Sequence, residues 1–208
     1  MFQELPLEAR REVARVFQPL RVRRGAVLYA LEDRVDGVYL VREGLLWLEG
    51  PGGGEGDPAT LGVVGPGGLL GEEALVGERR RTSGASALTY AELLFAPQEA
   101  LGDLRGRFPE VERFLLRALY ARLKAAEERL WETRHLSVGQ RLARLILRLS
   151  PQGEVALSHL DLARMVGATR ETVTKLLGEW ALMGVVDLGY RRLEVRDREA
   201  LVRLTEAL

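Results

Sequence analysis

Seven consecutive residues near the C-terminal end carry a dense set of hydrogen-bonding groups. Residues 169–175 read T-R-E-T-V-T-K and supply a guanidinium, a carboxylate, an ammonium and three hydroxyls. At helical spacing, Glu171, Thr174 and Lys175 fall on one side, with Arg170 at the leading edge. The segment therefore predicts a helix with a polar front that donates and accepts hydrogen bonds.

Two short helices joined by a tight turn are expected to hold this polar front. Ser158 begins the first helix, and Asp161 three residues later completes a capping-box pattern. Gly167 ends that helix at a point where the backbone needs a positive φ. Thr169 then caps the second helix, which runs over about residues 170–182.

The second helix has an apolar back behind its polar front. Its stripe follows the i, i+3, i+4, i+7 spacing and consists of Val173, Leu176, Leu177 and Trp180. A helix-turn-helix that reads the DNA major groove has this layout. An ordinary helical corner with a solvated face has the same spacing, and on spacing alone it stays open as the alternative.

The run T-R-E-T-V-T-K resembles the start of the recognition helix in the catabolite activator/fumarate-nitrate regulator family of bacterial transcription regulators. The resemblance implies that the DNA-contacting residues are Thr169, Arg170, Glu171, Thr172, Thr174 and Lys175. It implies a bidentate contact from Arg170 to guanine and acceptance by Glu171 from a cytosine amine. Lys175, where arginine is common in the family, is expected to reach a second guanine or a phosphate. Thr169 and Thr172, with the helix N-terminus, are expected to position the DNA backbone.

A second group of polar residues follows a Pro-Gly turn earlier in the chain. The run 37–49, followed by P-G-G-L-L-G-E-E (66–73) and R-R-R-T-S (79–83), resembles a cyclic-nucleotide-binding β-roll. The family's phosphate-binding cassette is matched here by Gly71, Glu72, Arg81 and Thr82. The resemblance implies that Glu72 bonds the ribose and that Arg81 with Thr82 holds the cyclic phosphate.

This cassette also departs from the family pattern. Glu73 places a second carboxylate beside the expected anion site, and Ala126 with Glu127 stands where the family supplies a hydroxyl pair to adenine. These differences favour another ligand, or none, over cyclic AMP, so no cofactor is assigned and a cyclic nucleotide stays an open alternative. A structural alternative is a solvated loop in which the arginines of 79–81 pair with Glu72, Glu73 and Glu78.

Short apolar segments separated by Gly- or Pro-containing turns occupy residues 19–96, after a short helix over 5–17. This regular spacing predicts an antiparallel β barrel or roll. The glycine-rich stretch 50–58 lacks the Lys-Ser/Thr of a phosphate-binding P-loop, so a flexible hairpin loop is expected there. The fold class is α+β, with the β-roll domain over residues 1–108.

A long helix is expected over residues 109–135, which contain no glycine or proline after Pro109. One apolar stripe consists of Val111, Leu115, Leu119, Leu123, Ala126 and Leu130, and a neighbouring one of Phe114, Ala118, Ala121 and Ala125. Two stripes on one helix need two partners. Both could be satisfied within one chain, but the family uses this helix for dimerisation, and the resemblance implies a homodimer.

The last part of the chain, residues 136–208, reads as a winged helix-turn-helix domain. Ser137 caps its first helix, and a hairpin at 185–196 carries Arg191 and Arg192 near a tip that can touch phosphate. Asp197 is expected to cap the final helix.

A dimer would place two recognition helices about 34 Å apart, one DNA turn, so a pseudo-palindromic double-stranded site is expected. The resemblance implies a transcription regulator, and we expect an activator that also contacts RNA polymerase. The alternative is a nucleotide-sensing module whose C-terminal domain contacts protein instead of DNA, and salt-dependent binding to duplex DNA would discriminate between the two.

Composition excludes several other classes. The 208 residues carry 30 basic and 30 acidic side chains and no cysteine, which rules out disulfides and iron–sulfur clusters. No apolar run reaches the roughly 18 residues of a membrane span, so a cytoplasmic protein with no membrane partner is expected. With no metal-ligand cluster and no Ser/His/Asp spacing, we expect no catalytic or metal-binding residues and no enzyme.

Overall fold

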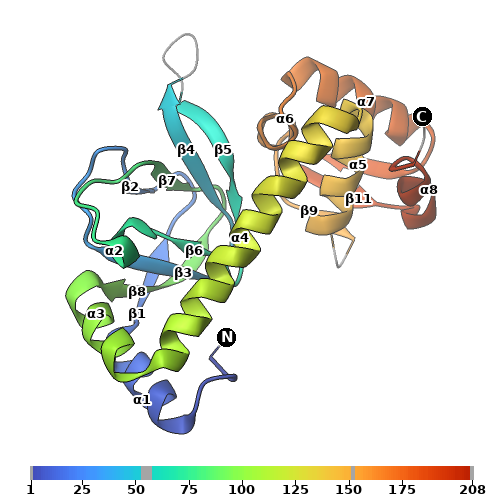
Figure 1. The fold of residues 1–208 in the computed structure, drawn as a ribbon. Helices are drawn as coiled ribbons and strands as arrows, with labels where there is room; N and C mark the ends of the chain where they lie inside the picture. The colour runs from blue at the N-terminus through green and yellow to red at the C-terminus, as the bar shows by residue number, and fades with distance from the viewer. Residues whose placement is uncertain (1, 53–57, 151–152, 207–208) are drawn as a thin grey trace. The chain divides into compact units, whose positions relative to one another are not determined.

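The computed structural model describes residues 2–52, 58–150 and 153–206. The chain divides into two compact units, Met1–Ala126 and Glu127–Leu208. Strands dominate the first unit and helices the second, which is the predicted α+β class (Figure 1). The division falls inside the long helix, and the predicted domain limits at 108 and 135 remain predictions.

The first unit is built on two four-stranded antiparallel sheets, as expected for a β-roll. One sheet has the strand order β1-β8-β3-β6 and the other β2-β7-β4-β5. The strands are β1 (Gln18–Val22), β2 (Val27–Tyr29), β3 (Gly37–Glu43), β4 (Leu46–Gly52), β5 (Pro58–Val64), β6 (Leu69–Leu70), β7 (Gly84–Ala87) and β8 (Ala91–Pro97).

Strand β3 is buried on both of its faces. Val38 and Leu40 belong to one apolar cluster, whereas Tyr39 and Val41 belong to another. Successive side chains of a strand point to opposite faces. Because both faces are covered, β3 reads as an unbroken apolar run and not as an alternating one.

The short apolar segments expected within residues 19–96 are 20–22, 27–29, 38–41, 45–48, 61–64 and 93–95, and they correspond to β1, β2, β3, β4, β5 and β8. Strand β7 was not predicted, because G-A-S-A has only small side chains and no apolar alternation; Ala85 and Ala87 are nevertheless buried beside β4. The predicted loop 50–58 lies partly outside the described residues. Its described ends belong to strands, and Gly52 pairs with Pro58.

Three helices and the beginning of a fourth cover one end of the strands (Figure 1). They are α1 (Leu7–Val16), α2 (Glu73–Val76), α3 (Gln98–Arg107) and α4 (Pro109–His135). Val13 of α1, Leu101 of α3 and Val111 of α4 meet in the same buried cluster as Leu40 of β3. This packing fixes α2 and the loop that follows it against the sheet.

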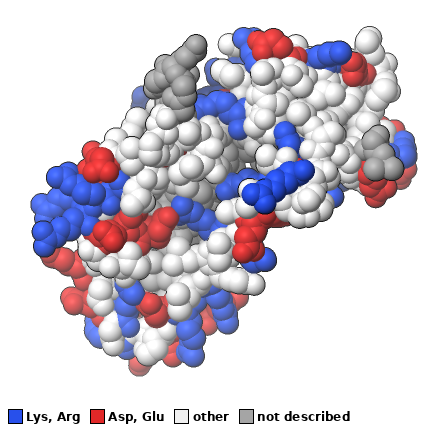
Figure 2. Space-filling model, turned by 45° about the horizontal axis from the view of Figure 1, so that its top comes forward, with Lys and Arg blue, Asp and Glu red and all other residues white. Residues whose placement is uncertain are grey.

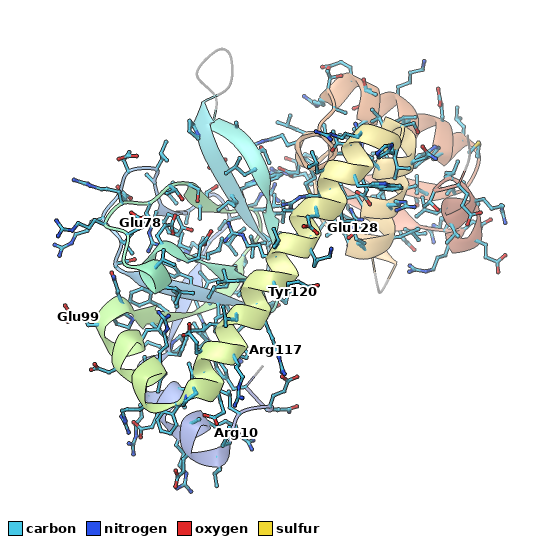
Figure 3. The ribbon with its side chains drawn as sticks, viewed as in Figure 1. Arg10, Glu78, Glu99, Arg117, Tyr120 and Glu128 are labelled. Carbon is cyan, nitrogen blue, oxygen red and sulfur yellow. The ribbon has the colours of Figure 1, made fainter. Side chains whose placement is uncertain are left out.

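Helix α4 has a buried face and an exposed apolar face. Val111 and Leu115 are buried. Four apolar side chains on another face are each at least 55% exposed: Leu116, Tyr120 (labelled in Figure 3), Leu123 and Leu130. Each step of four residues rotates by about 40° around a helix, so the predicted stripe from Val111 to Leu130 drifts out of the core. The predicted stripe is therefore divided between the two faces.

The second unit contains the end of α4, the helix α5 (Val138–Leu149), the two helices of the helix-turn-helix (α6, His159–Val166, and α7, Arg170–Leu182), a three-stranded sheet and a final helix, α8 (Arg198–Arg203). The strands of the sheet are β9 (Glu154–Val155), β10 (Val186–Gly189) and β11 (Arg192–Val195). The sheet order is β10-β11-β9. The β10–β11 hairpin is the predicted wing.

The caps of this unit are the predicted ones. Ser158 and Asp161 form a capping box, with the Asp161 N–H 3.1 Å from the Ser158 Oγ and the Ser158 N–H 2.9 Å from the Asp161 Oδ2. Ser137 forms another with Gln140, and Asp197 accepts a 2.8 Å hydrogen bond from the N–H of Ala200. These local bonds satisfy helix N–H groups that otherwise have no partner within the helix.

Charged side chains of both signs are distributed over the molecular surface. On the face drawn in Figure 2, acidic and basic groups lie near one another along much of the margin, wide areas carry neither sign, and basic groups gather at one edge of the β-roll. This mixture agrees with the equal numbers of acidic and basic residues in the sequence.

Candidate DNA-binding surface and effector site

The N-terminal turn of α7 is held by threonine hydroxyls. The Oγ1 of Thr169 accepts a 3.2 Å hydrogen bond from the N–H of Thr172 and lies 3.0 Å from the Thr172 Oγ1. Thr169 has extended backbone angles, whereas the helix begins at Arg170. The cap sets the position at which the polar side chains of α7 begin.

All six residues predicted to contact DNA lie at the solvent-exposed start and front of α7. They are Thr169, Arg170, Glu171, Thr172, Thr174 and Lys175. The opposite side of α7 is buried, with Val173 and Leu177 at 0% exposure and Trp180 at 4%. The apolar back thus anchors the helix and leaves its polar front accessible.

Helices α6 and α7 cross closely through small and apolar side chains. Leu162, Ala163 and Val166 of α6 are buried. Gly167 then adopts a φ of 66°, and no neighbouring atom lies within 4 Å of where its Cβ would be. Glycine is therefore favoured at position 167 because of the left-handed backbone conformation, and a Cβ there would not clash with any neighbour.

His159, expected from the sequence only as part of a helix cap, also contacts the front of α7. Its Nδ1 lies 3.1 Å from the Oγ1 of Thr174, so it links the start of α6 to the front of α7. Burial lowers the pKa of His159, and the positive charge of Arg170 lowers it further. His159 is therefore neutral at pH 7 and acts as a hydrogen-bonding group rather than a charge.

The wing places one of its two predicted arginines at the tip. Arg191 adopts a φ of 52° beside Tyr190, which is 92% exposed. Arg192 instead forms ion pairs with Glu154 at 3.0 Å and with Glu194 at 3.4 Å along the sheet. Arg191 is thus the better placed of the two to reach a phosphate.

In the first unit, the predicted cassette residue Arg81 is completely buried. Its Nη2 donates to the Asp36 Oδ1 at 2.5 Å and to the Gly37 carbonyl at 2.8 Å, and its Nη1 donates to the Glu73 Oε2 at 3.2 Å. The guanidinium lies over the ring of Tyr29, with its Cζ 4.3 Å from the ring centroid. Both terminal nitrogens of Arg81 are therefore engaged by the protein.

Thr82 is bonded to the same carboxylate as Arg81. The Glu73 Oε1 accepts hydrogen bonds from the Thr82 N–H at 2.9 Å and from the Thr82 Oγ1 at 2.8 Å. Glu73 is only 3% exposed. Burial alone would raise the pKa of its carboxyl, but the hydrogen bonds from Thr82 and the charge of Arg81 together lower the pKa below its ordinary value. Glu73 is thus an ionised, buried anion.

The remaining predicted cassette residue with a functional side chain, Glu72, has a different partner. Its Oε2 accepts a 2.6 Å hydrogen bond from the Nη1 of Arg122 on α4, which also donates to the Leu69 carbonyl at 3.2 Å. Arg122 was not recognised in the sequence, because an arginine on a long charged helix has no local signal of such a contact. The structure therefore separates Glu72 from the Glu73–Arg81–Thr82 group.

Gly71 allows Arg81 to approach the backbone. Its φ is 79°, and a Cβ at this position would lie 2.5 Å from the Arg81 Nη1 and 2.7 Å from the Gly37 carbonyl oxygen. Both the backbone conformation and the lack of space require glycine here.

Two buried polar atoms beside this group have no hydrogen-bond partner among the described residues: the Tyr29 Oη and the Arg81 Nε. Burial raises the pKa of Tyr29, and the negative charge of Glu72 raises it further. Tyr29 is therefore a neutral phenol at physiological pH.

The described part of the chain contains neither a membrane-spanning candidate nor a metal-type cluster. No described helix is long and apolar enough to cross a membrane. No three His, Cys, Asp or Glu side chains within residues 2–52, 58–150 and 153–206 are grouped as metal ligands would be.

Two parts of the chain match known domain families. Residues 140–204 match the Crp-like helix-turn-helix domain, which contains α6 and α7. Residues 19–107 match the cyclic nucleotide-binding domain, which contains the cassette around Arg81.

The chain matches transcription regulators over most of its own length and of theirs. The chain is 35% identical to the transcriptional regulator SdrP of Thermus thermophilus, covering 83% of this chain and 85% of that protein. It is 33% identical to the cyclic AMP receptor protein of the same organism, covering 92% and 90%. A solved CRP/FNR-family transcriptional regulator from Thermus thermophilus superimposes with a TM-score of 0.76 at 32% identity, over 91% of this chain and 99% of that one.

These matches cover both units, and the relatives are regulators rather than enzymes. Together with the β-roll, the long helix and the winged helix-turn-helix, they show that this chain belongs to the CRP/FNR family of transcriptional regulators and carries a helix-turn-helix DNA-binding domain.

Proposed function

We propose that the chain regulates transcription as a homodimer that inserts α7 of each subunit into successive major grooves of a pseudo-palindromic DNA site. The observation that carries this proposal is the polar front of α7, exposed at its N-terminal end and anchored behind by Val173, Leu177 and Trp180. Recognition helices of this motif contact base edges with their N-terminal residues.

The proposed base contacts follow from the hydrogen-bonding groups at the start of α7. Arg170 forms a bidentate contact to guanine O6 and N7, and Glu171 accepts from a cytosine amine. Lys175 reaches a second guanine or a phosphate. Thr169, Thr172 and Thr174 complete the surface, although the Thr174 hydroxyl also bonds His159. Phosphate contacts from Arg191 at the wing would add affinity without adding base specificity.

The exposed apolar face of α4 supports the proposed dimer. Leu116, Tyr120, Leu123 and Leu130 follow spacings of four, three and seven residues, which is the heptad spacing of a two-helix seam. Apolar groups aligned in this way on an exposed helix commonly mark a protein interface. A second copy of the chain offers an identical α4, which satisfies the requirement of a two-fold interface.

Activation and the contact with RNA polymerase are also part of the proposal. A Mycobacterium tuberculosis protein that is 27% identical to this chain, over 98% of it and 95% of that protein, is described as a CRP-like cAMP-activated global transcriptional regulator. By analogy we infer a regulator that works on promoter DNA in the cytoplasm. In-vitro transcription from a bound promoter, with and without the protein, measures whether transcript levels rise or fall.

The test of DNA recognition is selection of a duplex from a randomised library, followed by fluorescence anisotropy at several salt concentrations. We expect a two-fold symmetric consensus with half-sites about one turn apart. The logarithm of the binding constant should fall linearly with that of the salt concentration, by about 0.9 per phosphate contact. Failure to enrich any sequence, together with salt-independent binding, would instead favour a C-terminal domain that contacts protein.

A further inference from the structure

Arg81 and Thr82, the cassette residues expected to hold an anionic ligand, instead bind the carboxylate of Glu73. Three donors converge on the Glu73 carboxylate: the Arg81 Nη1, the Thr82 N–H and the Thr82 Oγ1, at 3.2, 2.9 and 2.8 Å. A guanidinium, a backbone N–H and a hydroxyl directed at one point are the groups that recognise a phosphate or a carboxylate. The resemblance assigned the Arg81–Thr82 pair to a cyclic phosphate, and the structure gives the same donors to Glu73.

We propose that the Glu73 carboxylate is a built-in replacement for the anionic part of an effector, so that the β-roll is closed to cyclic nucleotides. The residues present do not fit the cyclic phosphate that the domain family implies. In the β-roll the Glu73 carboxylate occupies the anion position of the cassette.

The charges around the site oppose a further anion. Arg81 is one positive charge, and it forms ion pairs with two carboxylates, Asp36 and Glu73. The neighbouring Arg122 is balanced by Glu72 at 2.6 Å. The five groups therefore carry one net negative charge before any ligand arrives. A cyclic phosphate, itself an anion, would have to enter a buried site of its own sign.

Competition also favours the internal carboxylate. Glu73 is the first residue of α2, nine positions before Thr82, and it is 3% exposed. A group attached to the same chain competes at an effective concentration of at least roughly millimolar. An effector at micromolar concentration must displace this carboxylate from its three donors.

The unpartnered Tyr29 Oη and Arg81 Nε do not restore an anion site. Arg81 Nε belongs to a guanidinium whose charge is already balanced, and Tyr29 lies beneath that guanidinium as its stacking partner. These two atoms can bond a neutral polar group such as water. They add no positive charge with which to hold a phosphate.

The proposal is tested on the full-length protein by thermal shift and isothermal titration calorimetry, with cyclic AMP, cyclic GMP and inorganic phosphate as probes. The variant Glu73→Ala removes the internal anion. Glu78→Ala is the matched control, because Glu78 lies in the loop directly after α2, is exposed (Figure 3), and its replacement makes the same change in net charge.

For the wild type and for Glu78→Ala, we expect no measurable heat with any probe and a Tm change within about 1 °C. In Glu73→Ala the charge on Arg81 is balanced only by Asp36. The Arg81 Nη1 and the two donors of Thr82 lose their acceptor and become available to a ligand. Its Tm should fall by roughly 10 °C. About 50 mM phosphate should restore several degrees of this loss in Glu73→Ala but not in the control.

Micromolar binding of either cyclic nucleotide to the wild type would overturn the proposal. It would also be overturned if Glu73→Ala were as stable as the control, or if phosphate affected the two variants equally. If Glu73→Ala does not fold, Glu73→Ser also removes the carboxylate from its three donors and leaves a short hydroxyl in its place. The same gain of phosphate-dependent stability is expected for that variant, and its absence counts against the proposal.

One functional consequence rests on the proposed function: the wild type should bind its duplex without any added nucleotide, and cyclic AMP should not change the affinity. The DNA-binding measurement can fail independently of the measurements with Glu73→Ala. A protein that binds no DNA but rejects cyclic nucleotides contradicts the proposed function and leaves the role of Glu73 intact. A protein whose DNA affinity rises with cyclic AMP contradicts the role of Glu73.

Discussion

Glu73 accepts two hydrogen bonds from Thr82 through a single carboxylate oxygen, at 2.9 Å from the backbone N–H and 2.8 Å from the hydroxyl. The other oxygen accepts from Arg81. This buried group joins the start of α2 to the end of the loop that leads into β7. It stabilises the cassette with residues of the chain alone, and its stability is linked to pH.

The pH dependence of folding should report the charge on Glu73. Its pKa is lowered from the ordinary value of 4.5, so the unfolded chain binds this proton more tightly than the folded chain does. The stabilising contribution is therefore complete above about pH 4.5 and is lost as the pH falls through the folded value. Denaturant unfolding should show that Glu73→Gln costs about 1–3 kcal/mol at pH 7 and progressively less below pH 4.5. Glu78→Gln should show no such trend, and a constant cost for Glu73→Gln would contradict an ionised Glu73.

Replacement of Gly71 should separate two causes of destabilisation. Gly71→Ala introduces a strained positive φ and places a Cβ against the Arg81 Nη1, whereas Gly77 has the same φ of 79° with no atom within 4 Å. Gly77→Ala should cost about 1 kcal/mol from backbone strain alone. Gly71→Ala should cost clearly more, because Arg81 must move away from Glu73. Equal costs in denaturant unfolding would mean that the position of Arg81 is not tightly fixed.

The anchor of α7 should be sensitive to truncation. Trp180→Ala removes a buried side chain, 4% exposed, and should lower the free energy of unfolding by about 3–5 kcal/mol. Leu182→Ala, two residues later and 91% exposed, should change it by less than about 0.5 kcal/mol. Circular dichroism during urea unfolding compares the two, and similar stabilities would show that α7 is not held by its apolar back.

The exposed face of α4 should control the oligomeric state. Leu123→Glu places a charge in the proposed seam and should convert a dimer to a monomer in light scattering coupled to size exclusion. Val76→Glu is the control, because Val76 on α2 is 76% exposed and lies outside the seam. A wild-type monomer, or a dimer unaffected by Leu123→Glu, would contradict the proposed interface.

Much of the second unit could be predicted from the sequence, because its determinants are local. The Ser158–Asp161 capping box lies within one helical turn, and Gly167 ends α6 by its own backbone preference. The spacing of Val173 and Trp180 defines the buried side of α7 without knowledge of any partner. Local rules of this kind need no tertiary information.

The cassette could be predicted only in part. The sequence located Gly71, Glu72, Arg81 and Thr82 and noted that Glu73 brings a second carboxylate to an expected anion site. It could not predict which glutamate bonds Arg81, nor the part played by Asp36, which lies 45 positions earlier. Such contacts depend on the pairing of strands far apart in the chain, and residue spacing does not encode them.

DNA recognition by the front of α7 is tested most directly by comparison of Arg170→Ala with Arg203→Ala. Arg203 lies on α8, outside the helix-turn-helix, so both variants lose one positive charge from an exposed arginine of the same unit. Anisotropy with the selected duplex, and with duplexes altered at each base pair, should show that Arg170→Ala weakens binding by about 1–3 kcal/mol and loses preference at one base pair in each half-site. Arg203→Ala should retain the wild-type preferences. If Arg170→Ala binds with unchanged affinity and base preference, α7 does not read the DNA in the way described.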